Sequence, residues 1–177
     1  MTSDTSLRYP IGGAKRAESF TAEERSAAIE GIRQLPQNLR SALAAFSEGQ
    51  LETPYRPDGW TVRQLVHHVA DSHMNAYTRV RLALTEDSPT IFAYQENRWA
   101  ELEDARVEPV STSLDLLSAL HVRWVRLFSS LAEQDWKRSY MHPVNGPQSV
   151  EQAAILYDWH GRHHIAHVTQ LSARMGW

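Results

Sequence analysis

The sequence has 177 residues, 42% hydrophobic and 22% charged, so we expect one globular domain spanning residues 1–177. Its net charge is −3 and it contains no cysteine. These values argue against a broad cationic surface for nucleic acid, and they exclude disulfides, thiolate zinc sites and a cysteine nucleophile. No run of about 18 apolar residues and no signal-peptide pattern occurs, so we expect a cytoplasmic protein without a membrane partner.

The N-terminal part of the chain predicts an arm followed by a helix. Residues 1–20 contain proline and glycine without periodic apolar spacing, which indicates an irregular arm. The first helix is expected near Thr21, because Thr21 and Glu24 have the spacing of a capping box. Pro36 predicts a kink or a restart within this helix. Residues 48–60 are rich in proline and glycine and predict a loop.

The middle of the chain predicts two further helices joined by a long connection. Thr61 and Gln64 form a second capping box, and a 3.6-residue apolar stripe follows it. Residues 86–112 form the connection, in which residues 94–104 predict a short helix. The third helix is expected to run from about Ser113 to Leu131 on the same kind of stripe.

The C-terminal part predicts a loop over residues 138–148 and a fourth helix after it. Ser149 and Gln152 supply its capping box, and the helix can run to Met175, just before Gly176. Four amphipathic helices without convincing strand alternation predict an all-α four-helix bundle with long interhelical connections. The length of the second connection permits a crossover between parallel helices.

Seven of the nine histidines lie in two short windows. They are His67, His68 and His73 in the second helix, and His160, His163, His164 and His167 in the fourth. His160 and His164 are four residues apart, as are His163 and His167, and residues so spaced share one helix face. Helical phase places His160 and His164 in an arc shared with Leu171 and Met175, with His163 at its edge.

In the second helix the same phase favours His68, which lies beside Leu65, over His67, which lies nearly opposite the apolar stripe. His73 lies within the stripe and is an alternative to His68 as the inward-facing histidine of this helix. Three neutral imidazoles from two facing helices can hold one divalent ion and leave a position open for water. Imidazole suits zinc, nickel, cobalt, iron and copper, so the ligand type does not select the metal.

The other candidates have simpler interpretations. His121 on the third stripe is expected to be a hydrogen-bonded core residue, and His142 beside a proline is expected to lie in a loop. Asp71 and Asp158 either orient imidazoles as hydrogen-bond acceptors or are solvated charges. The HExxH motif of zinc proteases is absent, so no general base is indicated by the motif.

Five segments of the chain resemble the YfiT-like branch of the DinB superfamily, in the same order and over nearly the whole length. They are RYPIG, TPYRPDGWTVRQLVHHVADSHMNAY, LHVRW, HPVNG and YDWHGRHHIAHVTQLSARMGW. The resemblance implies a four-helix bundle that holds a divalent ion through three histidines. The ligands it implies are His68, the second residue of the HH pair, with His160 and His164, which agrees with the helical phase.

The resemblance also implies function. Members of this branch are classed as metal-dependent hydrolases and are often dimeric. The resemblance therefore implies a homodimer in which each chain holds one ion, zinc or nickel. It also implies that the ion activates water for attack on a small-molecule substrate. Some relatives are thiol S-transferases that use bacillithiol, mycothiol or glutathione, so a metal-dependent thiol transferase is the second interpretation. A non-catalytic metal-binding stress protein is the third. Gly161 and Arg162, between two of the implied ligands, are expected to matter little.

Overall fold

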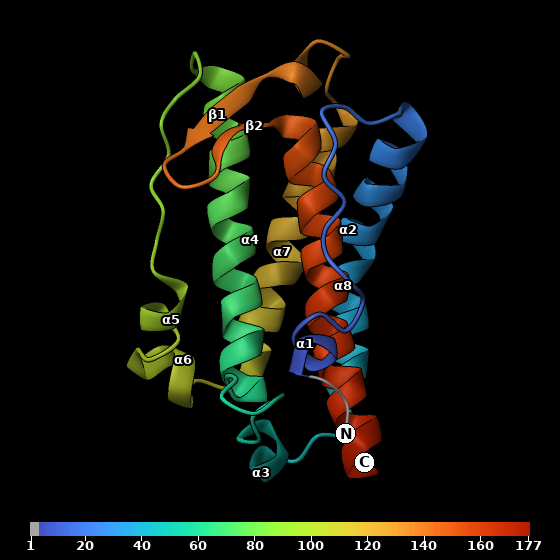
Figure 1. Cartoon of the computed structure of the whole chain (residues 1–177), viewed down its shortest axis with the longest axis vertical. Coiled ribbons are helices and arrows are strands. Elements are labelled where there is room, and N and C mark those ends of the chain that lie inside the picture. Colours follow the sequence, from blue (N-terminus) through green and yellow to red (C-terminus); the bar gives the residue numbers. More distant parts are fainter. Residues whose placement is uncertain (1–3) are drawn as a thin grey trace.

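The computed structural model describes residues 4–177, and within them four long helices form a bundle (Figure 1). They are α2 (Ala22–Leu43), α4 (Val62–Thr85), α7 (Val110–Ser129) and α8 (Val150–Met175). Helix α2 packs against α7 and α8, and α4 packs against the same two helices, so α2 and α4 lie on opposite sides of the bundle. The predicted all-α four-helix bundle is confirmed.

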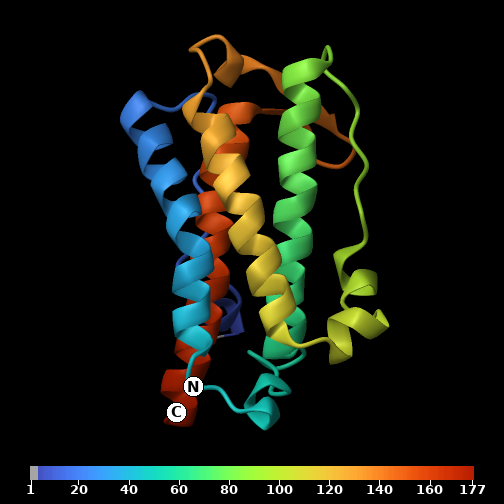
Figure 2. The same cartoon turned by 180° about the vertical axis from the view of Figure 1, so that it is seen from behind.

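The bundle is not a simple up-and-down arrangement. Helices α2 and α8 run in one direction, and α4 and α7 run in the other, as Figure 2 shows. Two consecutive parallel helices need a connection that returns along their length, and residues 86–109 do this along the outside of the bundle (Figure 2). This connection contains the short helices α5 (Glu96–Trp99) and α6 (Glu103–Val107), and Gln64 Nε2 donates to Ala100 O at 2.7 Å to hold it against α4.

Capping boxes begin three of the four long helices where the sequence predicts them. The Thr21 hydroxyl accepts from the Glu24 amide at 3.2 Å, and the Glu24 carboxylate accepts from the Thr21 amide at 2.9 Å. The same reciprocal pairs form at Thr61 with Gln64 and at Ser149 with Gln152. Helix α7 begins at Val110, three residues before the predicted Ser113, with Pro109 at the N-cap position. Helix α2 continues through Pro36 without the restart that this proline suggested.

The loop predicted over residues 138–148 is wrong, because these residues form a β-hairpin of β1 (Ser139–His142) and β2 (Gly146–Ser149). Its turn ends at Gly146, whose φ of 74° lies in the left-handed region that glycine tolerates best. Tyr140 is buried, and its hydroxyl donates to Gln148 Oε1 at 2.8 Å. The hairpin therefore covers one end of the bundle beside the C-terminus of α4 (Figure 1).

Shorter helices occupy two segments predicted to be irregular. Helix α1 (Asp4–Arg8) lies in the arm, whose first three residues are outside the described range, and α3 (Glu48–Leu51) lies in the loop before α4. The rest of the arm follows α8 closely. The indole of Trp159 donates to Gly12 O at 3.2 Å, and Gln152 Nε2 donates to Ala17 O at 3.0 Å.

The apolar core consists of two clusters with polar side chains between them. The hairpin-end cluster includes Trp124 and Phe128, and the opposite cluster includes Leu39, Leu65 and Leu117. The sequence positions that separate the two clusters on α4, α7 and α8 carry buried histidines. Over residues 4–177, each helix is too short or too polar to span a lipid bilayer.

Candidate metal centre

The three histidines predicted as ligands lie together where α4 faces α8. His68 extends from α4, and its ring centroid is 5.4 Å from that of His160 and 5.1 Å from that of His164 on α8. The Nε2 atoms of His160 and His164 are 3.2 Å apart. One ring nitrogen from each of the three lies within 4.8 Å of the others. The fold therefore brings three imidazole nitrogens close enough to bind one ion.

This arrangement fits a divalent ion. Zinc bound tetrahedrally by imidazoles has metal–nitrogen distances of about 2.0–2.1 Å, which separate its ligand nitrogens by about 3.3 Å. Burial lowers the pKa of His68 to about 4, and burial with neighbouring imidazoles lowers the pKa values of His160 and His164 well below the ordinary value. All three rings are therefore uncharged at neutral pH, the state in which imidazole binds metals.

A second group of histidines meets the same geometric criterion and shares one member. His163, His164 and His167 also place one nitrogen each within 4.8 Å of one another, and the Nε2 atoms of His163 and His167 are 3.0 Å apart. However, among residues 4–177 Nδ1 of His163 is buried without a hydrogen-bond partner, as is Nδ1 of His164, which both groups share, whereas Nδ1 of His160 lies 3.1 Å from His73 Nε2. Metal-binding histidines usually hydrogen-bond through their other nitrogen, which favours the group that contains His160.

The rings open onto a cavity of about 340 Å³ between the bundle and its loops. The arm contributes Arg8 to its lining, and the loop before α4 contributes Arg56 and Trp60, whose ring centroid lies 4.5 Å from that of His68. Asp58 and Glu96 also line it. The sequence alone did not single out these two carboxylates, because Asp58 lies in a loop and Glu96 begins the short helix α5, and neither belongs to a recognisable motif.

The remaining histidines have structural partners. His67 is buried rather than outward-facing, since its ring nitrogens lie 2.7 Å from Ser113 Oγ and 3.0 Å from Glu108 O at the start of α7. His73 lies outside both groups that could hold an ion. His121 is 2% exposed and hydrogen-bonded, as predicted for a core residue.

The two aspartates considered as imidazole acceptors do not fill that role among residues 4–177. Asp158 accepts from both Arg162 Nε and Nη2, at 3.1 and 2.7 Å, and is a charge on the helix face. Burial raises the pKa of Asp71 to about 6, but its side chain forms no hydrogen bond with an imidazole. The partner of His160 Nδ1 is another histidine, His73.

Comparison with known proteins identifies the family. The sequence profile of the DinB superfamily matches residues 32–168. The chain belongs to the DinB superfamily. It is 48% identical, over 100% of its length and 99% of the relative's, to a Bacillus subtilis (strain 168) protein named "Putative metal-dependent hydrolase YfiT". A Bacillus cereus (strain 03BB102) protein named "Putative metal-dependent hydrolase" is 49% identical over 97% of this chain and 98% of its own.

Two solved structures share the fold. The structure of YfiT from Bacillus subtilis, described as "a probable metal-dependent hydrolase with an unusual four-helix bundle topology", superposes with a TM-score of 0.95 at 47% identity. The match covers 97% of this chain and 99% of YfiT. A second four-helix bundle protein matches with a TM-score of 0.54 at 18% identity, over 86% of this chain and 99% of its own, which supports the fold alone.

In this DinB bundle, Gly161 is not a neutral spacer between two histidines. A Cβ added to it would lie 1.5 Å from Leu35 Cδ1 and 3.0 Å from Leu35 Cγ on α2. A Cβ added to Gly31 on α2 would similarly lie 1.8 Å from Asp158 Oδ1. The expectation that Gly161 matters little is therefore wrong, because α2 and α8 approach each other closely at two glycines, beside the candidate metal centre.

Proposed function

We propose that this protein is a metal-dependent hydrolase, whose single divalent ion per chain, nickel or zinc, is held by His68, His160 and His164. The observation that carries this proposal is the convergence of three uncharged, inward-facing imidazoles at the wall of a cavity large enough for a small substrate. The names of the related Bacillus proteins support the same reaction class.

The side chains around the centre have distinct roles in this proposal. His68, His160 and His164 are neutral ligands, so an ion held by them would keep its full positive charge and would supply an acidified water or polarise a substrate atom. Trp60 packs on His68 and restricts its ring orientation. Asp58 and Glu96 line the cavity, and a carboxylate oxygen of either can accept a proton from the attacking nucleophile.

Thiol transfer is the second proposed function, and two of the charged side chains in the cavity support it. Arg8 and Arg56 line the same space as the histidines. Guanidinium groups bind carboxylates in a fixed geometry, so the two arginines suit a small thiol that carries acidic groups. This function also needs the three histidines, and it differs from hydrolysis in requiring a second substrate.

A substrate screen with metal-loaded protein separates these proposals. Hydrolysis predicts turnover of esters or amides without added thiol, whereas thiol transfer predicts turnover of electrophiles only with bacillithiol, mycothiol or glutathione. His68→Ala and His160→Ala should each abolish tight stoichiometric metal binding and turnover. His67→Ala, a change of a buried histidine on the same helix, should retain both. Full metal content in His68→Ala protein would refute the ligand assignment, and a loaded protein inactive in every arm would support metal binding without catalysis.

Assembly as a homodimer and a cytoplasmic location also remain part of the proposal. Sedimentation velocity of the purified chain tests the first, since a dimer and a 20.2 kDa monomer sediment differently.

A further inference from the structure

A line of hydrogen-bonded groups crosses the bundle between its two apolar clusters and involves all four long helices. It begins at Ile32 O on α2 and passes through His121 on α7 and His73 on α4 to His160 on α8. The three separations are 2.6 Å from His121 Nδ1 to the carbonyl, 3.0 Å from His73 Nδ1 to His121 Nε2, and 3.1 Å from His160 Nδ1 to His73 Nε2. Every link is within hydrogen-bonding distance.

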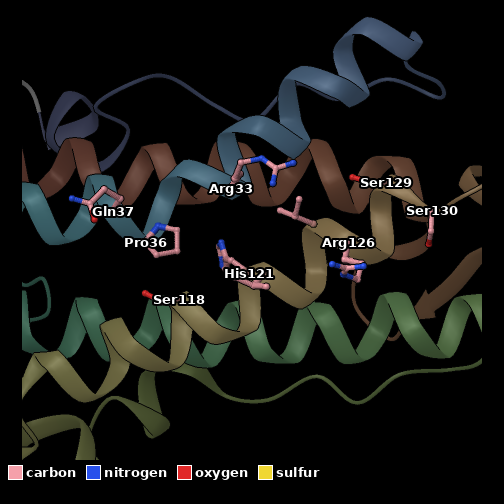
Figure 3. Close-up of a pocket in the computed structure, with 10 residues that line it drawn as sticks. Arg33, Pro36, Gln37, Ser118, His121, Arg126, Ser129 and Ser130 are labelled. Carbon is pink, nitrogen blue, oxygen red and sulfur yellow. The ribbon is translucent and has the colours of Figure 1, made fainter.

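A proline provides the starting point of this line. In an α-helix the carbonyl of residue 32 accepts from the amide of residue 36, but Pro36 has no amide hydrogen. Ile32 O is therefore free of its usual helical hydrogen bond, and it accepts one from His121 instead. Figure 3 shows His121 extending from α7 toward α2 beside Pro36. Because a carbonyl only accepts hydrogen bonds, His121 Nδ1 must carry the hydrogen.

The direction of every later hydrogen bond follows from this first one. His121 is 2% exposed and His73 is 0% exposed, and their hydrogen-bond partners in this line are a carbonyl and other imidazoles, so the cost of burying an unpaired charge keeps each ring neutral with one hydrogen. With its hydrogen on Nδ1, His121 accepts at Nε2, and His73 must donate from Nδ1. His73 then accepts at Nε2, and His160 must donate from Nδ1 to it.

The line thus ends on a candidate ligand with its Nε2 unprotonated. That Nε2 is the atom that lies 3.2 Å from His164 Nε2 in the candidate centre. We propose that His73 and His121 are positioning residues, which hold His160 as the Nδ1–H tautomer so that its Nε2 is free to bind the ion. The tautomer follows from this chain's own geometry, whereas its consequence for metal binding rests on the proposed function.

The line also distinguishes between the two overlapping histidine groups. Within the described range, 4–177, Nδ1 of His163 is buried without a partner, so none of these residues holds the tautomer of His163 in a comparable way. His73 is fully buried, with ring centroids 5.7 Å from Trp124 and 5.1 Å from Tyr157, which restrict the movement of its ring. The prepared ligand is therefore His160, and the ion should bind with His68 and His164.

The first test reads the tautomer directly in metal-free protein. Long-range ¹H–¹⁵N correlation spectra distinguish a protonated ring nitrogen from an unprotonated one in each neutral histidine. The wild-type protein should show His160, His73 and His121 all protonated on Nδ1. In His121→Leu, which does not touch a ligand, His73 loses its acceptor, and a population of His160 protonated on Nε2 should appear.

The second test measures affinity for Zn²⁺ or Ni²⁺ by competition with a chelator. Loss of an outer hydrogen-bond partner typically weakens metal binding about 10–100-fold, and this loss is expected for His73→Leu and His121→Leu. His73→Gln supplies an amide oxygen that can accept from His160 Nδ1, so it should recover most of the affinity. His67→Leu is the matched control, because His67 is also buried on α4 and its ring nitrogens bond to Ser113 and Glu108 rather than to a candidate ligand.

Three outcomes would overturn the proposal. The first is His160 protonated on Nε2 in wild-type metal-free protein. The second is unchanged metal affinity in folded His73→Leu or His121→Leu protein. The third is a His73→Gln protein as weak as His73→Leu, since this would assign the effect to packing rather than to the acceptor. Failure of wild-type protein to bind an ion through His160 would instead refute the proposed function, and the tautomer spectra would still test the hydrogen-bond line.

Discussion

Gly161→Ala offers the sharpest test of how α2 and α8 pack beside the candidate centre. Replacing glycine with alanine inside an exposed helix stabilises it by about 1 kcal/mol. At position 161, however, the new methyl group would lie 1.5 Å from Leu35 Cδ1 and 3.0 Å from Cγ. Leu35 is buried, so it cannot simply turn into solvent. Overpacking of a core costs about 1–3 kcal/mol, and so short a contact with a buried side chain should reach the upper end of this range. Subtracting the helix-propensity gain of about 1 kcal/mol leaves an expected net destabilisation of about 2 kcal/mol.

The sign of the effect should reverse when Leu35 is truncated. Leu35→Ala alone should cost about 2–5 kcal/mol, as large-to-small core changes do. It removes both colliding atoms and leaves Leu35 Cβ, which lies 3.6 Å from the added methyl group at an ordinary contact distance. In that background Gly161→Ala should therefore stabilise the protein by about 1 kcal/mol, which is the helix-propensity gain.

Urea unfolding of the four metal-free proteins, followed by far-ultraviolet circular dichroism, measures this cycle. The double variant should be more stable than Leu35→Ala, although Gly161→Ala is less stable than wild type. If Gly161→Ala destabilises both backgrounds equally, the contact with Leu35 does not explain the need for glycine, and the argument for a close approach at this point is wrong.

Three further predictions concern pH, metal and a buried charge. Burial lowers the pKa values of His68 and His163 from 6.5 to about 4, so the unfolded chain binds more protons between these pH values. Metal-free protein should therefore keep its full stability above pH 6.5 and lose about 1.4 kcal/mol per pH unit for each such histidine on acidification; a flat urea midpoint from pH 7 to 5 would contradict this. Chelation should lower the melting temperature of loaded protein, because ion at a thousandfold excess over Kd adds about 4 kcal/mol to the free energy of unfolding. The helical circular dichroism signal below the transition should stay unchanged. A coil-like spectrum after chelation would show that the fold depends on the metal. Glu151 is fully buried and accepts from Arg25 Nη1 at 3.3 Å and Lys137 Nζ at 2.8 Å. Glu151→Gln should therefore lower the free energy of unfolding in urea by about 3 kcal/mol. A Glu151→Gln protein as stable as wild type would show that these ion pairs contribute nothing.

Much of the bundle and of the candidate centre follows from local sequence rules. The capping boxes at Thr21, Thr61 and Ser149 form as predicted, because each involves only a side chain and an amide three residues apart. Helical phase also places His160 and His164 on one face, since the helix alone determines the angle between them. The hairpin was missed because its strands, β1 and β2, have only four residues each and little apolar alternation.

The sequence by itself determined which side chains each helix presents toward its neighbours, and the tertiary structure decided what they meet. His67 points away from the apolar stripe of its own helix, but α7 and the residue before Pro109 bury it. Gly161 resembles a spacer until α2 brings Leu35 against it. His73 and His121 become a line to His160 only because four helices converge where Pro36 leaves a carbonyl free. Periodicity within one helix specifies direction, whereas contact distance depends on how separate helices cross, and this is why these pairings are absent from any local pattern.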